Sequence, residues 1–167
     1  MKRGNKSAIA AAVCSATFIV ILGIAGYWER SIRVLHIFES LPYLAAATLS
    51  LRENKYGYAL GFASGAFWLW TAGFLTSFIR NGLEQLALWI RTGSAGRLDL
   101  LIAVPAAIST VGLVFFSGMA YAGLPNKSWR DVGVLLVAMA VITGFFVAIF
   151  AAFAPQYLGM FHSILGR

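Results

Sequence analysis

Long runs of apolar residues, separated by short polar connections, occupy most of this chain. Each run holds about 18 or more apolar or small residues, the length an α-helix needs to cross about 30 Å of hydrocarbon at about 1.5 Å per residue. Short connections favour antiparallel neighbours. The pattern therefore predicts a single all-α domain, a polytopic membrane helix bundle with five transmembrane helices at about residues 8–27, 34–51, 56–79, 98–124 and 132–153.

Two shorter segments have an amphipathic pattern instead. In residues 81–92, apolar positions recur on one helical face, while Glu84 and Arg91 fall on the other. Asn81 and Glu84 have the spacing of a capping box, which predicts that a helix begins there. This segment is too short to span a membrane, so we expect an interfacial helix that lies flat at the membrane surface. Residues 156–167 carry a similar stripe and predict an amphipathic tail.

Composition and charge identify the lipid bilayer as the main partner. The chain is 60% hydrophobic and 11% charged, whereas soluble domains carry about 25% charged residues. The net charge of +7 does not indicate nucleic acid, because the 13 Lys and Arg residues stand mostly at the ends of apolar runs, where they meet lipid headgroups. The cluster of Lys2, Arg3 and Lys6 favours an N-terminus inside and a C-terminus outside, and we expect the cytoplasmic (inner) membrane of a prokaryote.

Three glycines follow one another at a spacing of four residues in the third predicted span, at Gly57, Gly61 and Gly65. Such a series leaves a flat groove that lets another helix approach closely, and close packing drives helix association in lipid. The groove predicts a helix-packing interface. Its occupant is a helix of the same chain, another membrane subunit or a second copy of this chain.

The second predicted span contains two ionisable residues, His36 and Glu39, which are three positions apart and therefore share a helix face. A carboxylate inside a membrane must be protonated, paired or in contact with water. Pro42 leaves a backbone carbonyl free in the next turn, and Tyr43 adds a hydroxyl. These residues predict either local pairing of Glu39 with His36 or a polar site for a proton, an ion or a small ligand.

Two tryptophans, Trp68 and Trp70, lie near the middle of the third predicted span. They are candidates for stacking on a flat ring such as a quinone, although such side chains also fill space against neighbouring helices. A haem held by two histidines would need His162 besides His36, and these are the weak metal-ligand candidates of the chain. The sequence requires no cofactor.

No metalloprotease, phosphate-binding or serine-hydrolase motif occurs in the chain. We therefore expect a non-enzymatic integral membrane protein that acts as a small subunit or accessory factor of a membrane complex, or as a homo-oligomer. One alternative is a small oligomeric transporter or channel that uses Glu39 and His36 as its proton or ion site. Another is a redox subunit associated with quinone or haem.

Overall fold

The computed structural model describes residues 3–94, 96–125 and 128–159. The described residues form helices and their connections without a strand, so the fold is an all-α helical bundle. Its elements are α1 (Arg3–Trp28), η1 (Arg30–Ile32), α2 (Arg33–Leu51), α3 (Lys55–Trp70), the π-helical turn η2 (Thr71–Leu75), α4 (Phe78–Thr92), α5 (Leu98–Leu101), α6 (Ala103–Ala122) and α7 (Trp129–Phe153).

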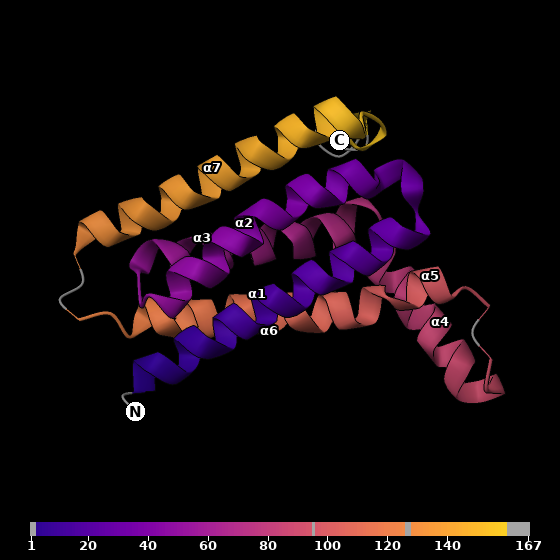
Figure 1. The fold of residues 1–167 in the computed structure, drawn as a ribbon, viewed down its shortest axis with the longest axis horizontal. Helices are drawn as coiled ribbons and strands as arrows, with labels where there is room; N and C mark the ends of the chain where they lie inside the picture. The colour runs from indigo at the N-terminus through magenta and orange to yellow at the C-terminus, as the bar shows by residue number, and fades with distance from the viewer. Residues whose placement is uncertain (1–2, 95, 126–127, 160–167) are drawn as a thin grey trace.

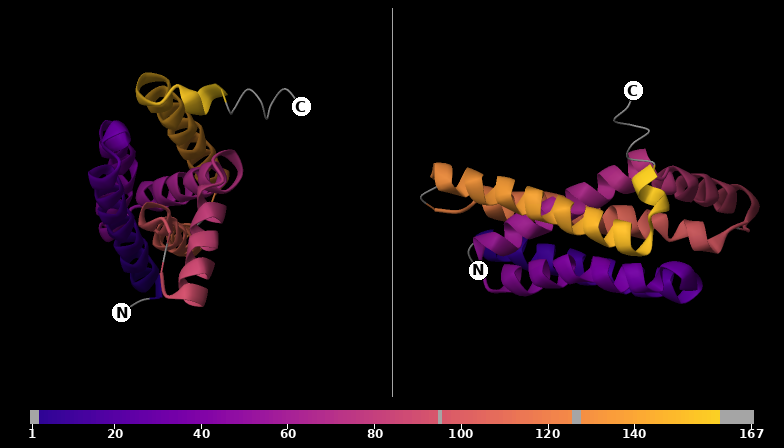
Figure 2. Two further views of the ribbon diagram at one scale, coloured as in Figure 1. Left: turned by 90° about the vertical axis from the view of Figure 1, so that its right-hand side faces the viewer. Right: turned by 90° about the horizontal axis from the view of Figure 1, so that it is seen from above.

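The long helices lie side by side along the longest axis of the molecule, and α4 leaves them at one end (Figure 1). Helix α3 contacts α1, α2, α6 and α7, and α1 packs against α2 and α6. Helix α7 contacts α3 and α2 and stands at one edge of the bundle in the end-on view of Figure 2. Helix α3 is thus the element on which the others converge.

Within the described ranges, four helical segments are long and apolar enough to cross a membrane: Lys6–Trp28, Arg30–Leu51, Leu98–Ala122 and Trp129–Phe153. A fifth span exists if Lys55–Leu75 and Phe78–Thr92 together form one broken span. Large apolar side chains on the outer faces are exposed, as lipid contact requires. The chain is an integral membrane protein.

The third predicted span, at 56–79, is bent near its end. The α-helix ends at Trp70, a π-helical turn follows, and Ser77 adopts a left-handed conformation with φ of 54°. The chain turns by 72° there. The break falls at Thr76 and Ser77, a polar pair too short to interrupt the apolar run on either side, so hydropathy does not reveal it. A backbone that leaves the α conformation ends the helix whatever its side chains are.

The helix expected to begin at Asn81 begins at Phe78, so the predicted capping box is not formed. Asn81 lies within α4, and Glu84 accepts a hydrogen bond from Nε of Arg80 at 3.0 Å. The fifth predicted span also starts earlier than expected, at Trp129. Of the predicted tail at 156–167, residues 156–159 form a helical turn, and the remainder lies outside the described residues.

A polar cluster joins three helix ends at the end of the bundle that holds the beginning of α1. The Lys55 ammonium donates to the Asp131 carboxylate at 2.8 Å, which ties the start of α3 to the start of α7. Tyr121, near the end of α6, donates its hydroxyl to the backbone carbonyl of Asp131. The same carboxylate accepts the backbone N–H of Ser128 at 2.8 Å. This end of the bundle is therefore fixed by hydrogen bonds as well as by packing.

The glycines of the predicted groove, Gly57, Gly61 and Gly65, lie at contacts inside the chain. A Cβ atom built on Gly61 would stand 2.5 Å from Oγ of Ser117 on α6, and Gly65 is similarly close to α6. A Cβ on Gly57 would stand 2.5 Å from the backbone nitrogen of Ser50 on α2. The groove is filled by the chain's own helices, so it does not present a surface to a second molecule.

We predict that Gly61→Leu destabilises the folded chain by about 1–3 kcal/mol, because the added side chain has no room between α3 and α6. Thermal unfolding in a mild detergent would measure the loss. Gly144→Leu on α7 is the matched control, since a Cβ there would meet no described residue within 4 Å apart from its own turn of the helix. Equal melting temperatures for the two variants would contradict the packing described here.

Candidate functional site

A cavity opens at the end of the bundle opposite the Lys55–Asp131 cluster, and we call this end the cavity end. The end of α1, the start of α2, the turn η2 and the end of α7 meet there (Figure 1). The cavity has a volume of about 540 Å³, which lies within the range of small-molecule sites. Residues from every long helix line it, so it lies along the axis of the bundle rather than on its surface.

The wall formed by α2 carries the candidate pair His36 and Glu39. Nδ1 of His36 lies 2.6 Å from Oε2 of Glu39, close enough to share one proton in a hydrogen bond. Glu39 is only 6% exposed, and among the described residues its ion-pair partner is His36. Pairing lowers the cost of a carboxylate in an apolar bundle. The pair is thus local, and it also faces the cavity.

Tyr43 lies one turn beyond Glu39 and is fully buried below the cavity. Its hydroxyl donates to the backbone carbonyl of Ser64 on α3 at 3.1 Å. Its ring lies 4.5 Å from that of Phe18, and Phe18 in turn lies 5.1 Å from Trp68, measured between ring centroids. Tyr43 therefore belongs to the aromatic base that closes the cavity rather than to its lining.

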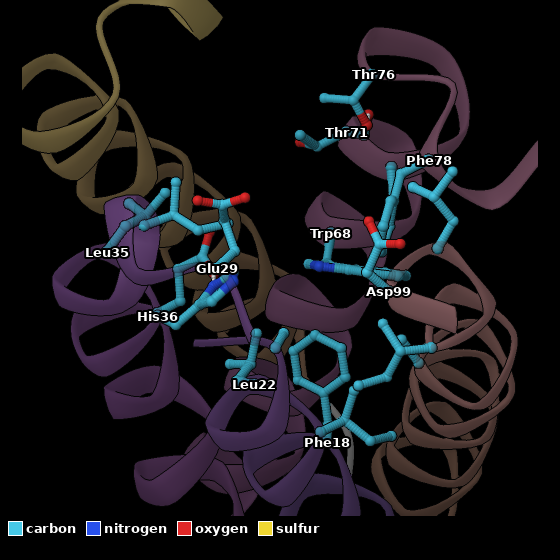
Figure 3. A pocket seen from close by; sticks show the side chains of 18 of the residues that line it. Phe18, Leu22, Glu29, Leu35, His36, Trp68, Thr71, Thr76, Phe78 and Asp99 are labelled. Atoms are coloured by element: carbon cyan, nitrogen blue, oxygen red, sulfur yellow. Dashed lines mark hydrogen bonds and ion pairs between the residues drawn. The ribbon is translucent and has the colours of Figure 1, made fainter. Parts of the chain in front are cut away.

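The two candidate tryptophans do not share a site. Trp68 lines the cavity, and its indole nitrogen points into it (Figure 3). Trp70 is not among the lining residues and is 39% exposed, with Phe67 as a ring neighbour at 6.1 Å. Residues two apart on an α-helix point about 200° apart, which explains the separation. The cavity therefore brings in Trp68 without Trp70, and stacking of a ring on Trp70 stays a prediction.

The metal-ligand candidates are not brought together in the part of the chain that the structure describes. His36 is engaged with Glu39, and His162 lies outside the described residues. Within the described ranges, no group of three or more His, Cys, Asp or Glu side chains has a geometry suited to a metal ion.

The mouth of the cavity is acidic, which the sequence analysis missed. Glu29 and Asp99 lie on opposite sides of the opening (Figure 3). Asp99 pairs with Arg97, whose Nε donates to Oδ1 at 3.2 Å, whereas Glu29 accepts the Ser31 hydroxyl at 2.6 Å. The sequence could have indicated this. Because successive spans alternate in direction, the end of the first predicted span, next to Glu29, lies at the same membrane face as the start of the fourth, next to Asp99.

The far wall ends at Tyr157, just beyond α7. Its ring packs on Phe150 with centroids 5.4 Å apart. Burial raises the pKa of the Tyr157 phenol above its ordinary value, and the negative charges of Glu39 and Glu29 raise it further. The phenol is therefore a neutral hydrogen-bond donor at physiological pH.

Several buried hydroxyls continue from the cavity toward the opposite end of the bundle. Thr71 lies at the cavity wall, and Ser15, Ser64, Ser117 and Ser50 lie in the core. None of these hydroxyls has a hydrogen-bond partner among the described residues. Small hydroxyl residues let helices approach closely, and they also leave polar groups along the axis beyond the closed base.

No family model, curated protein or solved structure matches this chain.

We predict that Tyr43→Phe lowers the free energy of unfolding by about 0.5–1.5 kcal/mol, because the variant loses the hydrogen bond to the Ser64 carbonyl. Chemical unfolding in detergent would measure the change. Tyr27→Phe is the control, since Tyr27 is 73% exposed. If both variants unfold like the unmodified chain, the bond does not hold α2 against α3.

Proposed function

We propose that this protein is a small membrane transporter, whose cavity takes up a solute and whose His36–Glu39 pair exchanges a proton as the solute binds. The observation that carries the proposal is the buried carboxylate–imidazole pair on the wall of an accessible cavity. Ionisable residues inside membrane spans mark ion and proton paths by default, because they are costly to keep there.

The depth of the pair supports this role. Glu39 lies about 9 Å along α2 from the first residue of that helix, at about 1.5 Å per residue. Histidine is the side chain whose charge ordinarily changes near neutral pH. A solute that interacts with Glu39 competes with His36 for the carboxylate, and the released proton passes to the water in the cavity. Solute binding and proton release are thereby coupled at one carboxylate.

Transport also requires the closed base of the cavity to open. The base is formed by Phe18, Tyr43 and Trp68, and it lies between two irregular helices. Pro42 interrupts the hydrogen-bond ladder of α2, and the turn η2 ends α3 with a π-helical segment. Both are places where a helix bends at low cost. The unpartnered hydroxyls beyond the base would then line the path to the other side.

The predicted orientation sets the direction of access. With the N-terminus inside, the cavity end faces outward, so the solute enters from outside the cytoplasmic membrane of a prokaryote. The Lys55–Asp131 cluster then lies at the inner face.

The two other hypotheses draw less support from the geometry. A role as a subunit or homo-oligomer rested on the glycine groove, which α6 and α2 occupy. A quinone site retains His36 and Trp68 but loses Trp70. Both stay predictions, and the transporter is the function that uses the cavity and its ionisable pair together.

Proton movement in vesicles tests the proposal. The protein is reconstituted into liposomes that contain a pH-sensitive dye, and a pH gradient is imposed. A panel of small aromatic solutes that carry a positive, a negative or no charge is then added outside. We expect at least one solute to accelerate collapse of the gradient, and we expect Glu39→Gln to abolish that acceleration without changing expression or the size of the purified particle.

The control is Glu84→Gln, which removes the same charge from an exposed position on α4 outside the cavity. It should behave like the unmodified protein, because exposed ion pairs contribute little. A Glu39→Gln variant that still moves protons at the normal rate would refute the proposed function.

A further inference from the structure

The charge inside the cavity is opposite to the charge of the chain. Of the six Asp and Glu residues in the sequence, three line the cavity, namely Glu29, Glu39 and Asp99. Among the Lys and Arg residues that the structure describes, Arg97 is the one that does. Even with His36 protonated, two positive charges face three negative ones. A strongly basic protein therefore contains an acidic cavity.

We propose that the solute is an amphipathic organic cation, such as an aromatic or quaternary amine. This inference rests on the proposed transport function and names its substrate class. The carboxylates lie at two levels: Glu29 and Asp99 at the mouth, and Glu39 further in. Asp99 is compensated by Arg97, whereas Glu29 forms no ion pair within the described residues. Glu29 thus attracts a cation to the opening, and Glu39 receives it.

Aromatic rings supply the second half of the site. Phe18, Trp68 and Phe78 form a contiguous wall, with Trp68 edge-on to each of its neighbours at 5.1 and 6.4 Å between centroids. Phe146 and Phe150 line the cavity from α7. Ring faces attract organic cations and stack on aromatic groups. Carboxylates combined with aromatic walls fit a solute with a positive centre and an apolar body.

The same lining disfavours the other solute classes. An anion would find Arg97 as its only charged Lys or Arg partner among the described lining residues, and Arg97 is already paired with Asp99. A bare metal cation needs several oxygen ligands close together, and the described residues offer no such group. A neutral apolar solute would leave Glu39 and Glu29 without a function.

Binding of three probes with similar shapes tests the substrate class. Phenyltrimethylammonium is cationic, tert-butylbenzene is its neutral carbon analogue, and benzenesulfonate is anionic. Isothermal titration of the full-length protein in lipid nanodiscs measures each, with empty nanodiscs as the baseline. We expect saturable binding of the cation, at least about tenfold tighter than that of either other probe, which corresponds to about 1.4 kcal/mol.

Variants locate the binding. We expect Glu39→Gln to weaken cation binding about tenfold or more, and Glu29→Gln to weaken it several-fold, more at low salt than at high salt. Glu29 is exposed, so its variant tests the site without disturbing the core. Trp68→Leu should lose affinity that Trp68→Phe retains, because the phenyl ring keeps an aromatic face. Glu84→Gln, outside the cavity, is the matched control and should bind like the unmodified protein.

The two proposals fail separately. Absence of cation binding, or equal or tighter binding of benzenesulfonate or tert-butylbenzene, overturns the assignment of an organic cation. If another member of the solute panel nevertheless drives proton movement that depends on Glu39, the transport proposal stands with a different substrate. If no solute moves protons through Glu39, the transport proposal itself is wrong, even where the cation binds.

Discussion

Close packing of small residues on α3 is the constraint on which this structure depends. Lipid is as apolar as the side chains it meets, so helices in a membrane are held by contact at short range. Gly57, Gly61 and Gly65 bring α2 and α6 against α3. From Phe67 onward the residues of α3 become bulky and the helix passes into the π-helical turn, and the cavity begins there. The glycine-rich first part of α3 packs tightly against its neighbours, and the bulky last part lines the cavity.

Much of the fold follows from hydropathy, because a span needs a certain length of apolar residues and short polar connections separate such runs in this chain. The bend between Leu75 and Phe78 was not predicted in this way, since the polar pair Thr76 and Ser77 is too short to interrupt the apolar run. At the site, the spacing of His36 and Glu39 placed both on one helix face and made pairing one of two predicted outcomes, and the structure brings them within hydrogen-bond distance. The contributions of Glu29 and Asp99 were not recognised, because each is an ordinary loop residue until the helices bring both to one opening.

The cavity joins features that have separate explanations when taken singly. A paired histidine and glutamate satisfy each other, aromatic rings fill space, and loop carboxylates meet solvent. All three kinds of side chain line one cavity of about 540 Å³ at a single end of the bundle, where they can act on the same solute. An acidic, aromatic cavity inside a basic membrane protein distinguishes solutes by charge and by shape. The pair on α2 adds a means of coupling that choice to a proton.

Solute uptake and proton exchange both require that water reaches the cavity. Cysteine labelling tests this access most directly. With Cys14 replaced by alanine, single cysteines are introduced at Ala25 and Ala72, which line the cavity, and at Ala63, which is buried outside it. The account predicts that a membrane-impermeant thiol reagent labels the first two positions, from one side of the membrane only, and leaves Ala63→Cys unlabelled. Protection of all three positions from both sides would contradict it.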